Sequence, residues 1–568
     1  MEMTGAKILM ECLLEQGVDL VFGYPGGTIL NVYDELYHYR DRITHILTAH
    51  EQGASHAADG YARSTGKVGV CLATSGPGAT NLTTGIATAY MDSSPVVFIT
   101  CNVTQNLIGR DAFQEVDITG IAMPITKCTY LVRDVNNLAD TVREAFAIAR
   151  SGRPGPVLID IVKNVTAEKA EYEPLPREEH IHSGRLANLI RRARTSSLKM
   201  PEPNQEDVNK LVEMIAQSKK PMLICGGGVV RGRADKQFRE FAEKLDAPVA
   251  ITVMGGGGFP GAHPLTTGMI GMHGSQASNV ACNECDLLVA VGCRFSDRVA
   301  LQPESFASQA KIVHIDIDRS EIDKNVLTDH HIVGSAKRVL ELLNERLPQY
   351  SHPEWKAHIL PLREKQPVED GDKLTPGQIL DAIQKAVPHD TIVATDVGQH
   401  QMWSIQHFHF EYPGQLLTSG GFGTMGFGLG AAIGAKMGNL DKVVVHTTGD
   451  GCFRMNCHEL ATVQHYNLPI ITVVFNNGTL GMVRQWQHLI YNEHYSQTTL
   501  DRGPDFVKLA EAYGLKGKRV TNRAEMEAAL QEALSCGCGY VIDCQIDMDE
   551  MVRPMVAGGA HITDFLLK

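Results

Sequence analysis

The sequence alternates short, mostly apolar segments with segments of helical periodicity, and it does so in three successive passes. Val68–Thr74, Pro221–Cys225 and Pro469–Phe475 are examples of the apolar segments. Strands of a parallel sheet are covered by helices on both faces, so they appear in the sequence as continuous apolar runs. The pattern therefore predicts an α/β fold with three doubly wound parallel-sheet domains.

Two segments that are charged or contain several prolines separate the three passes, namely residues 166–205 and 349–373. Such a composition does not fill a core, so we expect connecting segments there. The expected domains are residues 1–165, 190–345 and 374–546, with the second domain beginning inside the first connection. The tail, residues 547–568, is left unassigned.

Composition limits the classes of protein to consider. No run of about 18 apolar residues occurs, so we expect no membrane-spanning helix. The net charge of −13 and the pI near 6.0 argue against nucleic acid as a partner. The 13 cysteines are scattered, and the amino terminus carries no basic and apolar leader. We therefore expect reduced thiols and a cytoplasmic location.

The strongest chemical signal lies after two strands of the third pass. Gly449-Asp450-Gly451 follows one predicted strand, and Asn476-Asn477 follows the next. The carboxyl ends of parallel strands meet at one edge of the sheet, where ligands bind. The carboxylate of Asp450, the amide oxygen of Asn477 and the carbonyl of Thr479 are hard oxygen ligands that suit Mg²⁺ bound to phosphate. The alternative is two ordinary turns rich in Gly, Asp and Asn.

This pattern resembles the diphosphate-binding motif of thiamine diphosphate (ThDP) enzymes, which have a pyrimidine-binding, a central and a diphosphate-binding domain in that order. The resemblance implies a glutamate near residue 50 that drives the aminopyrimidine to its imino tautomer, and Glu51 supplies it. The alternative for Glu51 is an acid stabilised at a helix amino terminus. The resemblance also assigns cofactor contacts to Gly398, Gln399, His400, Gly423, Met425, Gly449, Gly451, Cys452 and Met482. Of these, Met425 has the alternative of a core residue that fills a gap.

Over nearly the whole chain, the sequence resembles the catalytic large subunit of acetolactate synthase, also called acetohydroxyacid synthase. The segments that carry the resemblance are Tyr24–Gly27, Ser75–Asn81, Asp111–Glu115, Ser151–Pro156, Gly271–Gly274, Arg294–Arg298 and Gly481–Trp486. The resemblance implies decarboxylation of pyruvate on ThDP and transfer of the hydroxyethyl unit to pyruvate or 2-ketobutyrate. The products would be 2-acetolactate or 2-aceto-2-hydroxybutyrate, for branched-chain amino acid biosynthesis. Another ThDP-dependent decarboxylase, carboligase or pyruvate oxidase stays open as an alternative, as does a non-catalytic subunit.

The same resemblance assigns an acceptor site. Arg298 would bind the carboxylate of the second 2-keto acid, because a guanidinium binds a carboxylate through two parallel hydrogen bonds. Trp486 would favour 2-ketobutyrate by packing against its extra methyl group. Phe113, Gln114 and Lys163 would line the same site. The alternatives are an ion pair of Arg298 with Asp297, a buried structural role for Trp486 and a solvated Lys163.

Acetolactate synthases of this type also bind FAD, and the resemblance places FAD on the central domain. The implied contacts are Arg153, Gly226, Gly227, Met272, His273, Arg294, Asp316 and Ile317. Asp316 ends a predicted strand, where a carboxylate can accept hydrogen bonds from ribose hydroxyls. The glycines at 226–228 do not form a full dinucleotide-binding fingerprint, so the resemblance alone carries this expectation.

The resemblance implies an assembly as well. In the family, the first domain of one subunit faces the third domain of another. We therefore expect a homodimer or tetramer whose active sites lie at the subunit interface, with Glu51 and Asp450 from different chains. Whether a small regulatory subunit binds is left open. Thr28, Cys101, Arg110, Ser296 and Cys452 depart from the usual family residues, which leaves acceptor preference open.

Overall fold

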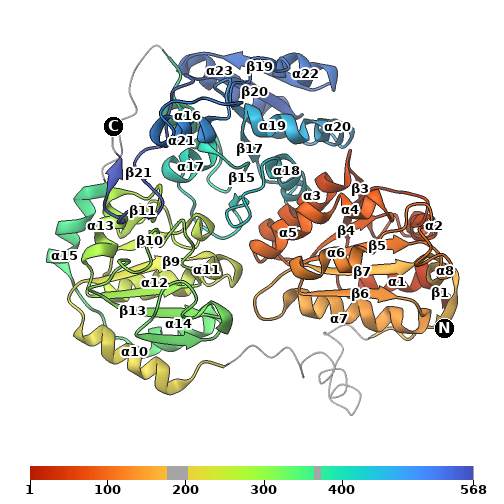
Figure 1. The fold of residues 1–568 in the computed structure, drawn as a ribbon, viewed down its shortest axis with the longest axis horizontal. Coiled ribbons are helices and arrows are strands. Elements are labelled where there is room, and N and C mark those ends of the chain that lie inside the picture. Colours follow the sequence, from red (N-terminus) through yellow and green to blue (C-terminus); the bar gives the residue numbers. More distant parts are fainter. Residues whose placement is uncertain (176–201, 364–372, 567–568) are drawn as a thin grey trace. The chain divides into compact units, whose positions relative to one another are not determined.

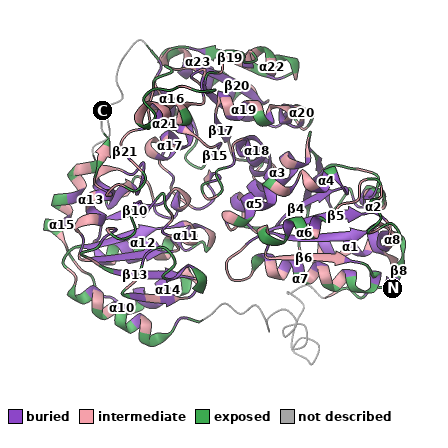
Figure 2. Cartoon of the chain, in the orientation of Figure 1, coloured by how far each residue is buried: buried purple, intermediate pink, exposed green. Residues whose placement is uncertain are grey.

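The computed structural model describes residues 1–175, 202–363 and 373–566, and this part of the chain contains three six-stranded parallel sheets flanked by helices (Figure 1). The predicted fold class is confirmed. In each sheet the central strands are buried on both faces, as their apolar sequences require (Figure 2).

The amino-terminal sheet has the strand order β3-β2-β4-β5-β7-β6. Its strands are β2 (Leu20–Gly23), β3 (Thr44–Leu47), β4 (Gly69–Ala73), β5 (Val96–Asn102), β6 (Cys128–Val132) and β7 (Val157–Val162). The longer helices of this domain are α1 (Gly5–Glu15), α2 (Leu30–His38), α3 (Glu51–Thr65), α5 (Thr83–Met91) and α7 (Leu138–Arg150).

The central sheet has the strand order β11-β10-β9-β12-β13-β14. Its strands are β9 (Pro221–Cys225), β10 (Val249–Ile251), β11 (Thr266–Met269), β12 (Leu287–Val291), β13 (Lys311–Asp316) and β14 (His330–Val333). Its longer helices are α10 (Gln205–Gln217), α12 (Asp235–Leu245), α13 (Gln276–Glu284) and α14 (Ala336–Arg346).

The carboxy-terminal sheet has the strand order β16-β15-β17-β18-β20-β19. Its strands are β15 (Ile392–Thr395), β16 (Leu416–Leu417), β17 (Val444–Gly449), β18 (Ile470–Asn476), β19 (Lys516–Val520) and β20 (Tyr540–Gln545). Its longer helices are α16 (Pro376–Ala386), α17 (Gln399–His407), α18 (Phe427–Gly438), α21 (Gly481–Ile490) and α23 (Arg523–Ser535).

The strand orders place the ligand-binding edge of each sheet. Counted from the first strand of each sheet, the first and third sheets share the order 2-1-3-4-6-5, and the central sheet has the order 3-2-1-4-5-6 of dinucleotide-binding folds. Ligands bind where the order reverses, at the carboxyl ends of the two strands on either side. In the third sheet these strands are β15 and β17, and in the central sheet they are β9 and β12.

Five strands are not predicted from the sequence, and each of them lies at the edge of a sheet, namely β6, β11, β14, β16 and β19. An edge strand is covered less completely, so its sequence is not continuously apolar. In β19, for example, Lys516 and Arg519 are exposed and only Val520 is buried. The continuous apolar pattern therefore finds the inner strands and misses these edges.

The expected connections contain some regular structure. β8 (Lys169–Glu171) pairs antiparallel with β1 (Glu2–Thr4). In the second connection, α15 (Pro353–Ile359) is fixed by Trp355, whose indole N–H donates to the carbonyl of Pro221 at 2.9 Å. The tail contains the antiparallel pair β21 (Met555–Val556) and β22 (Phe565–Leu566). Residues 176–201 and 364–372, the rest of the expected connections, lie outside the described residues.

The chain forms two compact units. The first unit combines the amino-terminal domain with Gly421–Lys442 and Met455–Ile470, and the second contains the central domain and the remainder of the carboxy-terminal domain. In the first unit, α18 packs closely along α3. A Cβ atom at Gly60 would lie 2.2 Å from the carbonyl oxygen of Ala431, and one at Gly434 would lie 1.8 Å from that of Ala57. Glycine on both helices therefore permits this backbone contact.

Candidate active site

Asp450 lies in the second unit, at the carboxyl end of β17, where it begins the short helix α19 (Asp450–Asn456). The backbone N–H groups of Gly451 and Gly478 lie near its carboxylate and favour its charged form. The contact with Gly478 joins the two turns that the sequence analysis relates to each other. The Oδ2 atom is buried and has no hydrogen-bond partner among the described residues. Burial raises the pKa of Asp450 to about 6.

Asn477 and Thr479 follow β18 beside this carboxylate. The Oδ1 atom of Asn477 accepts from the N–H of Thr479 at 3.2 Å, and its Nδ2 donates to Oε1 of Gln399 at 3.3 Å. A Cβ atom at Gly481 would lie 2.0 Å from Oε1 of Gln399, so a side chain there would have to displace the Gln399 amide. A buried carboxylate with one unpaired oxygen, next to neutral amide and carbonyl oxygens, fits a Mg²⁺ ion.

The residues after β15 surround the same turn. Gly398 has a φ of 151° and caps α17, which places Gln399 and His400 in the first turn of that helix. The His400 ring is buried, its Nε2 has no hydrogen-bond partner in the described part of the chain, and burial lowers its pKa to about 4. A Cβ atom at Gly449 would lie 3.0 Å from Nδ1 of His400. Nearby, Cys452 donates its thiol to the carbonyl of Val397 at 3.1 Å.

A buried polar cluster, which is not predicted from the sequence, stabilises the ends of β15 and β17 next to these turns. Nε2 of His446 lies 3.0 Å from Oδ2 of Asp396, and Thr448 donates to the same oxygen at 2.7 Å. Both His446 and Asp396 are fully buried, on the neighbouring strands β17 and β15 or directly after them. Breaking a buried pair of this kind costs far more than breaking a surface pair. The cluster therefore fixes the strand ends that carry Gly398 and Asp450.

Glu51 lies in the first unit as the first residue of α3, and His50 is its amino-terminal cap. The Glu51 side chain is largely buried, and its Oε2 accepts from Nδ2 of Asn81 at 2.9 Å. A Cβ atom at Gly78 would lie 3.1 Å from Oε1 of Glu51, so the turn after β4 also meets this carboxylate. The alternative of a helix-terminal acid describes its position correctly, and a role toward the cofactor stays a prediction.

A second acid, Glu459, holds the turn that precedes Glu51 and was missed by sequence reasoning. Its fully buried carboxylate accepts from the N–H groups of Ala49 and His50, each at 3.1 Å, and from the hydroxyl of Thr462 at 2.6 Å. A Cβ atom at Gly53 would lie 1.9 Å from its Oε1. Burial raises the pKa of Glu459, and these hydrogen bonds oppose the rise. No local sequence signal marks Glu459 as the residue that holds this turn, because the backbone groups of the turn lie about 410 residues away in the sequence.

Replacing Glu459 with glutamine is expected to lower turnover by about tenfold, because a loss of about 1.4 kcal/mol in positioning corresponds to that factor. An amide cannot match a carboxylate that accepts two backbone hydrogen bonds. Steady-state kinetics and amide hydrogen exchange at residues 49 and 50 measure the effect, and both amides should exchange faster. The control is Glu525→Gln, a half-buried glutamate that accepts from the Thr521 backbone. Unchanged turnover in Glu459→Gln would contradict this role.

In the second unit, Trp486 and Arg298, the two residues predicted to bind the acceptor substrate, lie near one apolar cluster. Trp486, on α21, packs against the cluster of Met272, Leu301, Met555 and Val556. The carbonyl of Arg298 accepts from the N–H of Met272 at 2.9 Å. The Arg298 guanidinium is exposed and lies 3.0 Å from a carboxylate oxygen of Asp297, so the alternative ion pair is present. Pairs of this exposure contribute little to stability, which leaves the guanidinium able to exchange partners.

The remaining predicted residues of the first unit lie on its surface or on turns. Phe113 is 88% exposed, and Gln114 has a φ of 61° with its backbone against Gly76. Lys163 donates to the carbonyl of Gly27 at 3.1 Å, so it is not merely solvated. Arg153 donates through Nε to the hydroxyl of Ser93 at 2.8 Å. Two further predicted residues, Gly423 and Met425, lie on the turn before α18, where the neighbouring Thr424 hydroxyl is 2.7 Å from that of Thr88.

Of the residues predicted to contact FAD in the central domain, Gly226 and Arg294 follow β9 and β12, the strands on either side of the reversal point of its sheet. Gly226 follows β9, and a Cβ atom there would lie 2.1 Å from the carbonyl oxygen of Gly292, which follows β12. Asp316 ends β13 at the same edge, followed by Ile317, and Arg294 lies just after Gly292. His273 is buried, and its Nδ1 has no hydrogen-bond partner among the described residues. This glycine-lined edge with a carboxylate fits a dinucleotide. Gly227 lies beside Met254, and Met482 packs against the carboxy-terminal core.

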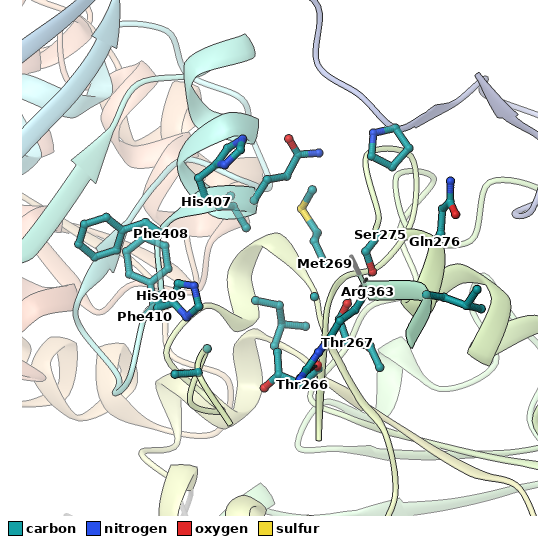
Figure 3. Close-up of a pocket in the computed structure, with 18 of the residues that line it drawn as sticks. Thr266, Thr267, Met269, Ser275, Gln276, Arg363, His407, Phe408, His409 and Phe410 are labelled. Atoms are coloured by element: carbon teal, nitrogen blue, oxygen red, sulfur yellow. Dashed lines mark hydrogen bonds between the residues drawn. The ribbon is translucent and has the colours of Figure 1, made fainter. Parts of the chain in front are cut away.

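A cavity of about 890 Å³ in the second unit is separate from these residues (Figure 3). One wall comes from the end of α17 and the segment after it, including His407, Phe408 and Phe410, and the opposite wall includes Thr267 and Met269 of β11. None of the predicted site residues lines this cavity.

No helix of the described residues has both the length and the apolar character needed to cross a bilayer.

Comparison with known proteins defines the class first. Three family models match: Thiamine pyrophosphate enzyme, N-terminal TPP binding domain, at residues 3–121; its central domain, at 208–343; and its C-terminal TPP binding domain, at 396–544. The class is thus the ThDP-dependent enzymes, as predicted.

Full-length relatives then define the family. A probable acetolactate synthase large subunit of Methanocaldococcus jannaschii is 44% identical over 99% of this chain and 95% of its own. An acetolactate synthase of Arthrospira platensis is 44% identical over 99% and 97%. The acetolactate synthase isozyme 2 large subunit of Escherichia coli is 43% identical over the full length of both chains. The chain belongs to the acetolactate synthase large-subunit family, which confirms the predicted family.

Proposed function

We propose that this chain decarboxylates pyruvate and transfers the resulting two-carbon unit to a second 2-keto acid, either pyruvate or 2-ketobutyrate. The products are 2-acetolactate and 2-aceto-2-hydroxybutyrate, the carbon skeletons for branched-chain amino acids. The observation that carries the proposal is the full-length similarity to acetolactate synthases together with the buried, half-paired Asp450 carboxylate at a sheet reversal point. ThDP, when bound, supplies the nucleophilic carbon and the electron sink for this chemistry.

The chain's own residues bind the cofactor and handle its proton. Asp450, Asn477 and Thr479 would hold Mg²⁺ through oxygen atoms, and backbone N–H groups near Gly449 and Gly451 would bind the diphosphate. Glu51 would hold the pyrimidine ring through its carboxyl group, donating a hydrogen bond when it is protonated and accepting one when it is ionised, and so move a proton to and from the ring. Asn81 orients the Glu51 carboxylate, and Glu459 holds its helix turn.

The acceptor is held by a cation and an apolar wall. Arg298 leaves Asp297 to bind the acceptor carboxylate through its guanidinium. Trp486 and the apolar cluster around Met272 contact the acceptor's alkyl group and exclude water, which would otherwise protonate the two-carbon unit and release acetaldehyde. The resemblance to the family also assigns Phe113, Gln114 and Lys163 to acceptor binding. The glycine-lined edge of the central sheet would hold FAD, and the resemblance adds Arg153 to the residues assigned to FAD binding.

The active assembly is a homodimer or a tetramer. In each active site, Glu51 and Asp450 come from different chains. The relatives are named large subunits, which supports a small regulatory subunit as an additional partner. All 13 cysteines are free thiols, which fits a reducing, cytoplasmic compartment.

Product identification tests the proposed function. The purified chain is incubated with pyruvate, ThDP, Mg²⁺ and FAD, with and without 2-ketobutyrate, and the products are identified by mass spectrometry. We expect 2-acetolactate from pyruvate alone and 2-aceto-2-hydroxybutyrate from the mixture. Acetaldehyde or acetyl phosphate as the main product would instead place the chain among ThDP decarboxylases or pyruvate oxidases.

Replacing Trp486 with leucine is expected to reduce the preference for 2-ketobutyrate over pyruvate by about tenfold. One methylene in an apolar pocket contributes about 1–3 kcal/mol to discrimination, and the smaller side chain removes most of the contact. The ratio of the two products in direct competition measures the change, and total turnover should fall much less. Trp403→Leu, a buried tryptophan in the carboxy-terminal core, is the control for general loosening. An unchanged product ratio would leave Trp486 as a packing residue only.

A further inference from the structure

Two cysteines of the second unit lie side by side on the connection between α23 and β20. Cys536 is the carboxy-terminal cap of α23, and Cys538 lies two residues before β20. Their sulfur atoms are 3.4 Å apart. Gly537 between them has a φ of 65°, a conformation that glycine adopts without strain, and this tight turn brings the two thiols together.

These thiols differ from most cysteines of the chain in being accessible. Nine of the 13 cysteines are buried, whereas Cys536 and Cys538 are only half-buried. Cys536 also contacts the carbonyl groups of Ala533 and Cys538, each at 3.3 Å. Among the described residues, no group of three or more His, Cys, Asp and Glu side chains is placed to hold a metal ion. A metal site at these two thiols therefore lacks further ligands, and redox chemistry is the reading that the geometry favours.

We propose that Cys536 and Cys538 are a reversible redox site, which a low-molecular-weight disulfide converts to an intrachain disulfide. The thiolate of Cys536 attacks one sulfur of the reagent and expels the other as a thiolate. The thiolate of Cys538 then attacks the Cys536 sulfur of this mixed disulfide and expels the second thiolate. One S–S bond breaks and one forms, the chain loses two protons and two electrons, and two reduced small thiols are released.

The order of attack follows from the surroundings of the two thiols. The Cys538 thiol donates a hydrogen bond to the Cys536 sulfur, and burial together with this neighbour raises the pKa of the Cys538 thiol, so Cys538 acts second. The pair lies at the amino end of β20, since Tyr540 pairs with Ile471 and Gln545 pairs with Asn476 in the parallel strand β18. The predicted Mg²⁺ ligands follow the opposite end of that strand. We therefore expect the disulfide to form without blocking turnover.

The test oxidises the full-length protein with oxidised glutathione and measures its intact mass. We expect a loss of the mass of two hydrogen atoms, loss of two titratable thiols per chain, and a cross-linked peptide joining Cys536 to Cys538; a reducing thiol should reverse all three. Cys538→Ser should instead keep one glutathione adduct, on Cys536. Cys128→Ser/Cys457→Ser, which removes the other two half-buried thiols, should behave like the parent.

Three results would overturn the proposal. One is a parent protein in which Cys536 or Cys538 accumulates a glutathione adduct, or in which both thiols stay reduced. Another is a Cys538→Ser variant that still loses two hydrogen atoms, and the third is a cross-link between two chains. Thermal unfolding of each reduced variant, matching that of the parent, shows that the substitution leaves the fold intact.

Discussion

Replacing Glu51 with glutamine is expected to lower turnover by about 100- to 10,000-fold, the range that a positioned acid–base group contributes. Glutamine keeps the size of the side chain and one acceptor oxygen, so Asn81 retains a partner at this position. It cannot exchange a proton with the pyrimidine ring, so the exocyclic amine of the ring loses the tautomeric shift that lets it take the proton from C2. Binding of ThDP, which is held mainly through the metal and diphosphate, should change by much less.

The control for this variant is Glu206→Gln, an exposed glutamate in the first turn of α10. It tests whether removing any helix-terminal acid affects turnover. Turnover of Glu51→Gln within twofold of the parent, with ThDP bound, would show that Glu51 only stabilises the amino terminus of α3.

Replacing Asp450 with asparagine is expected to weaken activation by Mg²⁺ and ThDP by at least about 100-fold, because the only carboxylate among the predicted ligands is lost. Even outer contacts to a metal ion are worth 10- to 100-fold in affinity. Without cofactor, the variant should be at least as stable as the parent, because the substitution removes a buried charge with an unpaired oxygen. The substitution is therefore expected to weaken activation by the cofactors but not to lower the stability of the cofactor-free protein.

Thermal unfolding with and without Mg²⁺ and ThDP separates these effects. A ligand that binds the folded state raises the unfolding temperature of the parent, and the rise grows with the logarithm of the ligand concentration divided by Kd. The Asp450→Asn variant should lose this rise, whereas the exposed control Asp441→Asn should keep it. A full cofactor-induced rise in Asp450→Asn would remove Asp450 from the metal site.

The inner strands and the main site turns could be predicted from the sequence, because both depend on local patterns. β9, for instance, has the predicted bounds Pro221–Cys225, since a central strand covered on both faces is apolar throughout. Asp450 and Asn477 could be related because each directly follows such a strand, and the carboxyl ends of parallel strands share one edge.

The parts that escaped prediction depend on contacts between distant residues. Edge strands such as β19 carry charged side chains that are compatible with a loop, and only pairing with β20 identifies them. Glu459 cannot be found from its neighbours, because its partners are backbone N–H groups of residues 49 and 50. Gly53 accommodates Glu459, and Gly60 accommodates α18, and both contacts join segments that are far apart in the sequence.

We expect Glu51 to accelerate the removal of the proton from C2 of the bound cofactor. Hydrogen exchange at that carbon tests this role most directly. The enzyme with Mg²⁺ and ThDP is mixed with deuterium oxide, quenched in acid at short times, and the C2 proton signal is measured by NMR. We expect exchange in the parent to be at least 100-fold faster than in Glu51→Gln and in free ThDP. Equal exchange rates in the parent and in Glu51→Gln would contradict the account.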